Sequence, residues 1–366
     1  MSNREQDFKD IWSIIEEEKL KAIEDKSDET KSQETNVFFI GCKNSGKTTL
    51  ILKFLEREET PKPTTGLEYT YGRRTRGMNL AKDVAHLWEL GGGTFLSQLL
   101  NIPLTTDTIS NSSVLIILDL SKPDELWDVM ESLINELRSR IKSIVSDLRS
   151  TNPAIVTDLR RKAKEKHGAG HPDEPVLTPL PIPVAFIGTK YDVFQDFDPE
   201  KKKIISRTLR FVAHKYGASL YYFSNKSETL VTRCRQVITH FAFNGPLNQA
   251  VSMDYNKPLI VPVGSDSIGQ IGIPSLSSGD DLAKIGAESK SPFDVWKQAY
   301  CGFFPQAPKD HQIFDDPCKD LRYKEPSIDS MRSQKDEELE RYKKECERKA
   351  RQREQAKINS TGKRSS

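Results

Sequence analysis

The residues with the clearest chemistry form a phosphate-binding motif near the start of the chain. The segment Gly41-Cys42-Lys43-Asn44-Ser45-Gly46-Lys47-Thr48 fits the pattern G-x-x-x-x-G-K-[ST] without deviation. In this pattern backbone N–H groups point at phosphate oxygens, the lysine contacts the β- and γ-phosphates, and the last hydroxyl binds Mg²⁺. The sequence therefore predicts a nucleotide phosphate site with Thr48 as a metal ligand. Its predicted residues are Gly41, Asn44, Ser45, Gly46, Lys47, Thr48 and Thr49.

The surrounding sequence supplies the elements that this motif requires. The apolar run Val37-Phe38-Phe39-Ile40 predicts a buried strand that ends at Gly41, and a helical pattern follows from Thr49 to Leu55. The order strand, loop, helix favours a working phosphate loop. Two alternatives remain open, namely a chance Gly-Lys-Thr loop and a relic that no longer binds nucleotide.

Two further segments stand where a GTPase carries its switches. Pro63-Thr64-Thr65-Gly66 places Thr64, 17 residues after Lys47, where a threonine contacts Mg²⁺ and the γ-phosphate. The segment Trp88-Glu89-Leu90-Gly91-Gly92-Gly93 follows a predicted strand, with Glu89 at the position of an expected aspartate. Gly92 would offer its amide to the γ-phosphate. We therefore predict Thr64, as a second Mg²⁺ ligand, and Gly92 as site residues.

Gly93 stands where many GTPases have the glutamine that orients the attacking water. Glycine has no side chain for this task, so we expect slow turnover unless a partner supplies the missing group. A tight turn is an alternative reason for three consecutive glycines.

The base-recognition element is expected at residues 189–192. Asp192 would accept the two guanine N–H donors, and the Lys190 stem would pack over the base. Thr189 replaces an asparagine, which predicts the loss of a tie between this loop and the phosphate loop. Ser224 lies in a segment expected to make the last base contact.

The elements that must position these residues alternate between apolar runs and helical patterns. Runs at residues 84–90, 114–118, 184–187 and 218–223 predict strands, and the alternation predicts an α/β fold with a doubly wound, mostly parallel sheet. A long helix is expected over 124–150, lying on the sheet or in a partner groove, or forming a coiled coil. Residues 151–175 read as an insertion extending away from the domain, and 258–263 as an edge strand. Ser291 and Pro292 predict the start of a short helix bearing Phe293, Trp296 and Tyr300, which would belong either to the core or to a docking surface.

Composition limits the class of protein. The chain has 366 residues, with 36% apolar and 30% charged content, and a mean hydropathy of −0.59. No apolar run approaches the roughly 18 residues of a membrane span, and the five cysteines form no CxxC pair. These features predict a cytosolic-side protein with reduced thiols.

The charge is distributed unevenly and suggests three parts. Residues 1–34 carry six basic and eleven acidic side chains, and residues 331–366 carry twelve basic and seven acidic ones. We expect an amphipathic helix and linker over 1–34, a nucleotide-type domain over 35–305 and a charged helical or disordered tail over 306–366. The basic tail raises a nucleic-acid or acidic-lipid contact as an alternative, but its interleaved glutamates favour a solvated, salt-bridged helix.

Several separate sequence segments resemble those of one known family. The phosphate loop, Gly66-Leu67-Glu68-Tyr69-Thr70-Tyr71-Gly72-Arg73-Arg74, the Trp88–Gly93 segment and Lys190-Tyr191-Asp192-Val193-Phe194 are similar to the light intermediate chains of cytoplasmic dynein. The run Lys190-Tyr191-Asp192-Val193-Phe194-Gln195-Asp196-Phe197 is most similar to the dynein-2, ciliary, branch. The resemblance covers roughly residues 35–305.

This resemblance implies a Ras-like P-loop G domain used as a non-catalytic adaptor. It implies docking on the dynein-2 heavy chain, with other dynein-2 subunits nearby and microtubules contacted only indirectly, without nucleic acid or membrane insertion. The implied role is retrograde intraflagellar transport and cilium assembly. The implied location is cytoplasm, cytoskeleton and cilium, including axoneme, basal body and centrosome. The site would hold GTP or GDP with Mg²⁺, or no nucleotide. The alternative function is a slow, activator-dependent GTPase switch.

Overall fold

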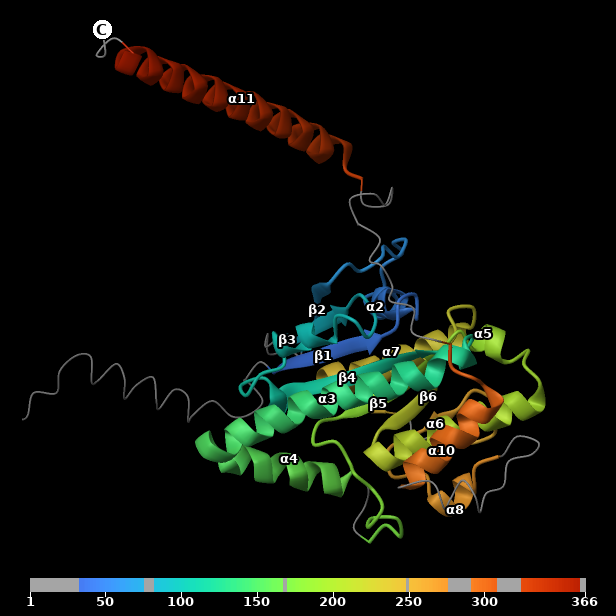
Figure 1. Ribbon diagram of the computed structural model, residues 1–366. Coiled ribbons are helices and arrows are strands. Elements are labelled where there is room, and N and C mark those ends of the chain that lie inside the picture. Colours follow the sequence, from blue (N-terminus) through green and yellow to red (C-terminus); the bar gives the residue numbers. More distant parts are fainter. Residues whose placement is uncertain are drawn as a thin grey trace, which may run out of the picture. The chain divides into compact units, whose positions relative to one another are not determined.

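The computed structural model describes residues 33–75, 82–166, 170–247, 250–275, 291–307 and 324–362, with side chains up to residue 352. The chain divides into two compact units, Met1–Pro308 and Lys309–Ser366 (Figure 1). Each unit is described by itself. The predicted amphipathic stretch at Phe8 to Ile15 lies outside the described residues, and the three-part division of the chain stays a prediction.

A seven-stranded sheet forms the centre of the first unit, with the strand order β2-β3-β1-β4-β5-β6-β7. The five middle strands are parallel, and the two edge strands, β2 and β7, are antiparallel to their neighbours. This arrangement confirms the predicted α/β fold, and β7 confirms the edge strand expected over 258–263. The strands are β1 (Glu34–Gly41), β2 (Leu67–Thr75), β3 (Lys82–Leu90), β4 (Ser112–Asp119), β5 (Val184–Thr189), β6 (Ser219–Tyr222) and β7 (Ile260–Val261).

Helices cover both faces of the sheet (Figure 1). On one face, α2 (Lys47–Phe54) and α7 (Glu228–Phe243) pack against alternate side chains of the strands. The other face carries α3 (Pro123–Thr151), α6 (Pro199–Tyr216) and α10 (Pro292–Phe303). Shorter elements are the 3-10 helices η1 (Ser97–Asn101) and η2 (Ile109–Asn111), and the helices α5 (Tyr191–Phe194) and α8 (Ile268–Ile271).

Helix α3 has the length and position that the sequence predicts. Its apolar residues recur at spacings of three and four, so they form one stripe, and that stripe is buried in the core. The helix therefore lies on the sheet. Trp127 on this stripe contacts Phe293 and Tyr300 of α10, with ring centroids 5.1 and 5.8 Å apart. Since Tyr300 is buried, the aromatic residues of α10 belong largely to the core.

The expectation that residues 151–175 extend away from the domain is wrong. Residues Pro153–Glu165 form a helix, α4, that folds back against α3 (Figure 1). Val156, Leu159 and Ala163 lie at spacings of three and four and are buried on the side that meets α3. The polar composition of this segment reflects the other, solvated side of an amphipathic helix.

The sheet topology places the phosphate loop at its switch point. In the sheet, β1 has β3 on one side and β4 on the other. Loops at the carboxyl ends of adjacent strands diverge there, which leaves room for a ligand. The segments that follow the parallel strands therefore meet at one edge of the sheet, and those after β1, β3, β5 and β6 contain most of the predicted site residues.

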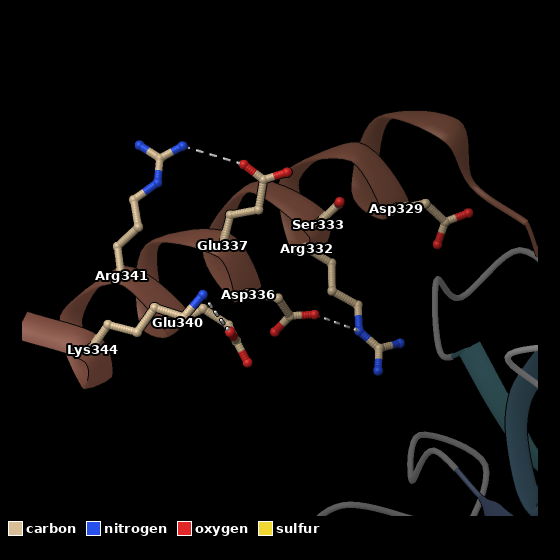
Figure 2. Close-up of a pocket in the computed structure, with 8 residues that line it drawn as sticks. All are labelled: Asp329, Arg332, Ser333, Asp336, Glu337, Glu340, Arg341 and Lys344. Atoms are coloured by element: carbon tan, nitrogen blue, oxygen red, sulfur yellow. Dashed lines mark ion pairs between the residues drawn. The ribbon is translucent and has the colours of Figure 1, made fainter. Parts of the chain in front are cut away.

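The second unit contains the helix α11 (Pro326–Gly362). Every side chain described on it is exposed. Figure 2 shows ion pairs between residues four apart, including Arg341 with Glu337 and Lys344 with Glu340. The hollow of about 520 Å³ in this view is lined only by side chains of the same helix, so it is the space between long side chains on one surface. The helix is confirmed and has the salt-bridged character that the sequence favours.

Among the described residues, no helix combines the length and apolar character needed to cross a membrane.

Candidate nucleotide-binding site

The phosphate loop adopts the backbone conformation that its glycines permit. Asn44 and Gly46 lie in the left-handed region, with φ of 63° and 91°. A Cβ on Gly41 would lie 2.4 Å from the carbonyl oxygen of Ile117 on β4, so only glycine fits there. Ser45 is buried and its Oγ finds no hydrogen-bond partner among the described residues.

Helix α2 begins at the end of this loop with unpaired backbone donors. Gly46 is the N-cap, and no described side chain caps the helix. The first N–H groups of a helix have no partner within it, and they add partial positive charge. Lys47, Thr48 and Thr49 supply these groups, so the start of α2 is suited to an anion such as phosphate.

The Lys47 side chain folds back onto its own loop. Its Nζ donates hydrogen bonds to the carbonyl oxygens of Gly41 at 3.2 Å and Cys42 at 2.8 Å. Burial lowers the pKa of this lysine, and the nearby Glu89 carboxylate opposes that shift. The positive charge is therefore held among the loop's carbonyls in this structure.

The two predicted Mg²⁺ ligands converge on one carboxylate. Thr48 Oγ1 donates to Glu89 Oε1 at 2.7 Å, and Thr64 Oγ1 donates to the same oxygen at 2.8 Å. Glu89 is only 4% exposed. Hydroxyl and carboxylate oxygens are ligands that Mg²⁺ accepts, so the donor set fits a hard divalent cation. Glu89, near the end of β3, is not among the predicted metal ligands, although it stands at the position of the expected aspartate.

The three glycines after β3 meet both a turn requirement and a space requirement. Gly92 and Gly93 have φ of 67° and 62°, in the region that favours glycine. A Cβ on Gly91 would lie 2.6 Å from the carbonyl oxygen of Thr64, and the Gly91 amide donates to the carbonyl oxygen of Gly66. The tight-turn explanation for these glycines is therefore supported. A side chain at Gly93 would start 3.4 Å from the backbone nitrogen of Lys43, beside the phosphate loop.

The expected loss of a tie at Thr189 is wrong. Thr189 Oγ1 donates to the carbonyl oxygen of Ser45 at 2.7 Å and lies 3.1 Å from that of Leu118. A hydroxyl reaches the phosphate loop because Thr189 ends β5 directly beside it. The loop after β5 is therefore joined to the phosphate loop without an asparagine amide.

The predicted base-recognition residues come together at the same edge. Ser224 Oγ donates to Asp192 Oδ1 at 2.8 Å, and Lys226 forms an ion pair with Asp192 Oδ2 at 2.7 Å. The hydrogen bonds from Lys226 and Ser224 hold the pKa of Asp192 below its usual value. Asp192 is therefore an oriented carboxylate acceptor, as recognition of guanine N–H donors requires.

Asp119 also lies in this region, although the sequence assigns it no role. Lys190 Nζ forms an ion pair with Asp119 Oδ2 at 2.5 Å, and Asp119 Oδ1 accepts from the backbone N–H and the hydroxyl of Ser121. Asp119 is the last residue of β4, at the carboxyl edge where the other loops meet. An acidic residue directly after the apolar run 114–118 was the available signal.

A cavity of about 530 Å³ opens on the metal side of the site. Its lining includes Thr48 and Glu89, together with side chains of α2, of residues 57–62 and of β2. Neither Asp192 nor Ser224 lines it. The structure thus provides a phosphate cradle, an oxygen cluster and a carboxylate acceptor, and these groups fit a guanine nucleotide with Mg²⁺.

Comparison with known proteins assigns the chain to a family. The family described as "Dynein light intermediate chain (DLIC)" matches residues 6–168. Cytoplasmic dynein 2 light intermediate chain 1 of Bos taurus is 47% identical over 338 residues, covering 91% of this chain and 95% of that protein. The Homo sapiens protein of the same name is 46% identical with the same coverage.

More distant relatives are also described as dynein light intermediate chains. Cytoplasmic dynein 1 light intermediate chain 1 of Homo sapiens is 23% identical, covering 74% of this chain and 56% of that protein. A solved structure described as the dynein light intermediate chain's conserved domain aligns with a TM-score of 0.53 and 18% identity, covering 74% of this chain and 98% of that one. At this identity the solved structure supports the fold alone. The relatives of the dynein 2 type match over nearly their whole length at 44–47% identity, and the chain therefore belongs to the dynein light intermediate chain family.

Proposed function

We propose that this protein is a non-catalytic light intermediate chain of a cytoplasmic dynein 2 motor. It docks on the motor's heavy chain, stabilises it and serves retrograde intraflagellar transport and cilium assembly. The observation that carries the proposal is the contrast in similarity. The dynein 2 relatives are 44–47% identical over at least 91% of this chain, whereas the dynein 1 relatives are 23% identical over 74%.

The geometry of the nucleotide site supports the non-catalytic part of this proposal. Gly93 offers no side chain to orient a water molecule, and Glu89 is hydrogen-bonded to both Thr48 and Thr64. Lys47 is likewise engaged by carbonyls of its own loop. These contacts join the switch segments to the phosphate loop, as suits a site that stabilises the fold.

We further propose that the site binds GTP or GDP with Mg²⁺ and retains it without rapid turnover. The start of α2 and Lys47 would hold the phosphates, Thr48 and Thr64 would contact the metal, and Asp192, positioned by Ser224, would recognise guanine. Mg²⁺ would supply charge neutralisation at the phosphates. Nucleotide extracted from the purified full-length protein and separated by chromatography tests this. One guanine nucleotide per chain supports it, and an adenine nucleotide or none contradicts it.

A groove between α3 and α4 supports docking on a partner. It has a volume of about 740 Å³, an apolar floor and a basic rim, and residues 178–181 close one side. The floor is lined by half-buried Val145 and by Ile141, Val156 and Leu159, which are themselves largely buried, and the rim includes Arg138, Lys142, Arg149, Arg160 and Lys164. An apolar floor between cationic side chains complements an amphipathic helix with acidic flanks. We assign this groove to such a helix of the heavy chain.

The docking proposal is tested by producing the dynein 2 heavy chain with and without this protein. We expect the two proteins to purify together and the soluble yield of heavy chain to rise when this protein is present. Co-purification and yield that do not depend on this protein would contradict the proposal.

The second candidate function is a slow GTPase switch that depends on an activator. The intact phosphate loop and the oriented Asp192 favour it. Single-turnover hydrolysis distinguishes the two: GTP cleavage faster than the buffer blank, and abolished by Lys47→Ala, would establish the switch.

We further propose that the protein is located with the rest of the motor in the cytoplasm, on the cytoskeleton and in the cilium, at axoneme, basal body and centrosome.

A further inference from the structure

Three side chains with metal-binding atoms converge far from the nucleotide site. His171 and Asp173 lie in the connection between α4 and β5, and His214 lies on α6. One ligand atom of each lies within 4.8 Å of the others. Among the residues that the structure describes, this is the one group of three or more His, Cys, Asp or Glu side chains with such proximity.

The distances identify which atoms face one another. His214 Nε2 lies 2.8 Å from Asp173 Oδ2, and His171 Nδ1 lies 4.0 Å from the same oxygen. The two imidazole rings have centroids 5.2 Å apart. Two ring nitrogens and one carboxylate oxygen therefore surround a common point, with only small shifts needed to bring all three to about 2.0–2.2 Å from an ion.

The neighbours of His171 fix its tautomer. Its Nε2 lies 3.0 Å from the carbonyl oxygen of Asp266, which can only accept, so Nε2 carries the proton. Nδ1 is then unprotonated, and it accepts the backbone N–H of Asp173 at 3.2 Å. A metal-bound histidine usually donates its other ring N–H to a carbonyl or carboxylate. His171 already has this arrangement.

A second layer of contacts holds Asp173 and the support of His171 in place. Asp173 Oδ2 accepts the backbone N–H of Ile268 at 2.8 Å. Asp266, whose carbonyl orients His171, is bound through both carboxylate oxygens by Arg210 at 2.7 Å. Both members of that pair are buried. The cluster therefore sits on a rigid support formed by α6 and the segment around α8.

The cluster is almost enclosed but remains reachable. His214 is 2% exposed, His171 11% and Asp173 15%. Low exposure removes competing water from the ligands, while the edge at His171 and Asp173 leaves a route for an ion and for a solvent ligand. This degree of burial suits a site with three protein ligands and one open position.

We propose that His171 Nδ1, Asp173 Oδ2 and His214 Nε2 bind a divalent transition metal ion, with Zn²⁺ as the best match and water as the fourth ligand. Two imidazoles and one carboxylate are a donor set that zinc accepts in tetrahedral sites. On binding, the proton of His214 Nε2 moves to Nδ1 or leaves to solvent, and the Asp173 amide gives up its bond to His171. The ion ties the connection after α4 to α6.

The first test is a Zn²⁺ titration of full-length protein that has been stripped of metal with a chelator and dialysed. We expect one Zn²⁺ bound per chain by calorimetry. His171→Ala should weaken the affinity at least about 100-fold, since losing even an outer partner of a ligand costs roughly 10–100-fold. His86→Ala is the matched control, because His86 is also partly exposed beside a carboxylate, with Nε2 3.8 Å from Glu34. It should bind Zn²⁺ like the unmodified protein.

The second test needs no variant, so it stands even if His171→Ala fails to fold. X-ray absorption at the zinc edge of the Zn²⁺-loaded protein should show two imidazole ligands and oxygen ligands, without sulfur. Absence of stoichiometric binding, binding unchanged in a folded His171→Ala protein, or a coordination shell containing sulfur would each overturn the proposal.

Discussion

Thr48 of the phosphate loop donates a hydrogen bond to Glu89 at 2.7 Å, and the same carboxylate oxygen also accepts from Thr64. The loop after β1, the end of β3 and the segment before β2 are thus joined through one buried oxygen. In a switch these segments respond separately to the γ-phosphate. Here one buried carboxylate oxygen joins them, so this contact contributes to the stability of the domain.

Replacing Glu89 should therefore cost stability. Glu89→Ala leaves both hydroxyls without their acceptor, and we expect the free energy of unfolding to fall by roughly 2 kcal/mol, the usual range for bonds to a charged group. Glu89→Gln keeps an acceptor oxygen and should cost about half as much. Urea denaturation followed by circular dichroism measures both. Equal stability of Glu89→Ala and the unmodified protein would show that the shared oxygen does not join these segments.

The stability of the fold should also depend on the close approach of Gly91 to the Thr64 segment. A methyl group at Gly91 would lie 2.6 Å from one backbone oxygen and 2.8 Å from another, whereas at Gly66 its nearest neighbour is a Leu99 methyl at 3.9 Å. We expect Gly91→Ala to destabilise by about 1–3 kcal/mol through overpacking. Gly66→Ala, the control, should change stability by less than about 1 kcal/mol. Similar thermal unfolding of the two variants would refute this explanation for the glycine.

The contacts of Asp192 predict a specific dependence on pH. Its folded pKa is depressed by Lys226 and Ser224, so its contribution to stability is present above the unfolded value of about 4 and is lost as the pH falls through the folded value. Asp192→Asn should thus be less stable than the unmodified protein at pH 7, and the difference should shrink below about pH 4. Urea denaturation across this range measures it. A difference that does not change with pH would contradict the assignment.

The groove between α3 and α4 can be tested with neighbouring residues of one helix. Arg160 lines the groove, whereas Arg161 does not and instead pairs with Asp158 and Glu165. We expect Arg160→Glu to reduce the amount of heavy chain that co-purifies, because it places an acidic group on the basic rim. Arg161→Glu makes the same charge change outside the groove and should leave recovery unchanged. Equal recovery with both variants would place the contact elsewhere.

Much of this fold follows from hydrophobic pattern, but two features do not. Strand β2 was not predicted, because it is an edge strand whose side chains are mostly exposed, so Tyr69 and Tyr71 give no buried alternation. Helix α4 was read as an extension because its few apolar residues are outnumbered by charged ones. Both features depend on neighbours that are distant in sequence, or on a helix that packs through a narrow stripe.

The candidate site shows the same limit. The motif spacing identified the residues that meet at the carboxyl edge of the sheet, because most of them follow a strand. The pairing of Lys190 with Asp119 and the bond from Thr189 to Ser45 depend on which strands are neighbours. Since β4 lies between β1 and β5 only in the folded sheet, these contacts required the structure.

The central claim is that the protein acts as a motor subunit whose phosphate loop serves structure more than switching. The most direct measurement is affinity purification from ciliated cells of the unmodified protein and of Lys47→Ala, with mass spectrometry of the bound proteins and nucleotide. We predict that both forms recover the dynein 2 heavy chain in similar amounts, while Lys47→Ala retains less nucleotide. Loss of the heavy chain from a stably folded Lys47→Ala protein would contradict the account.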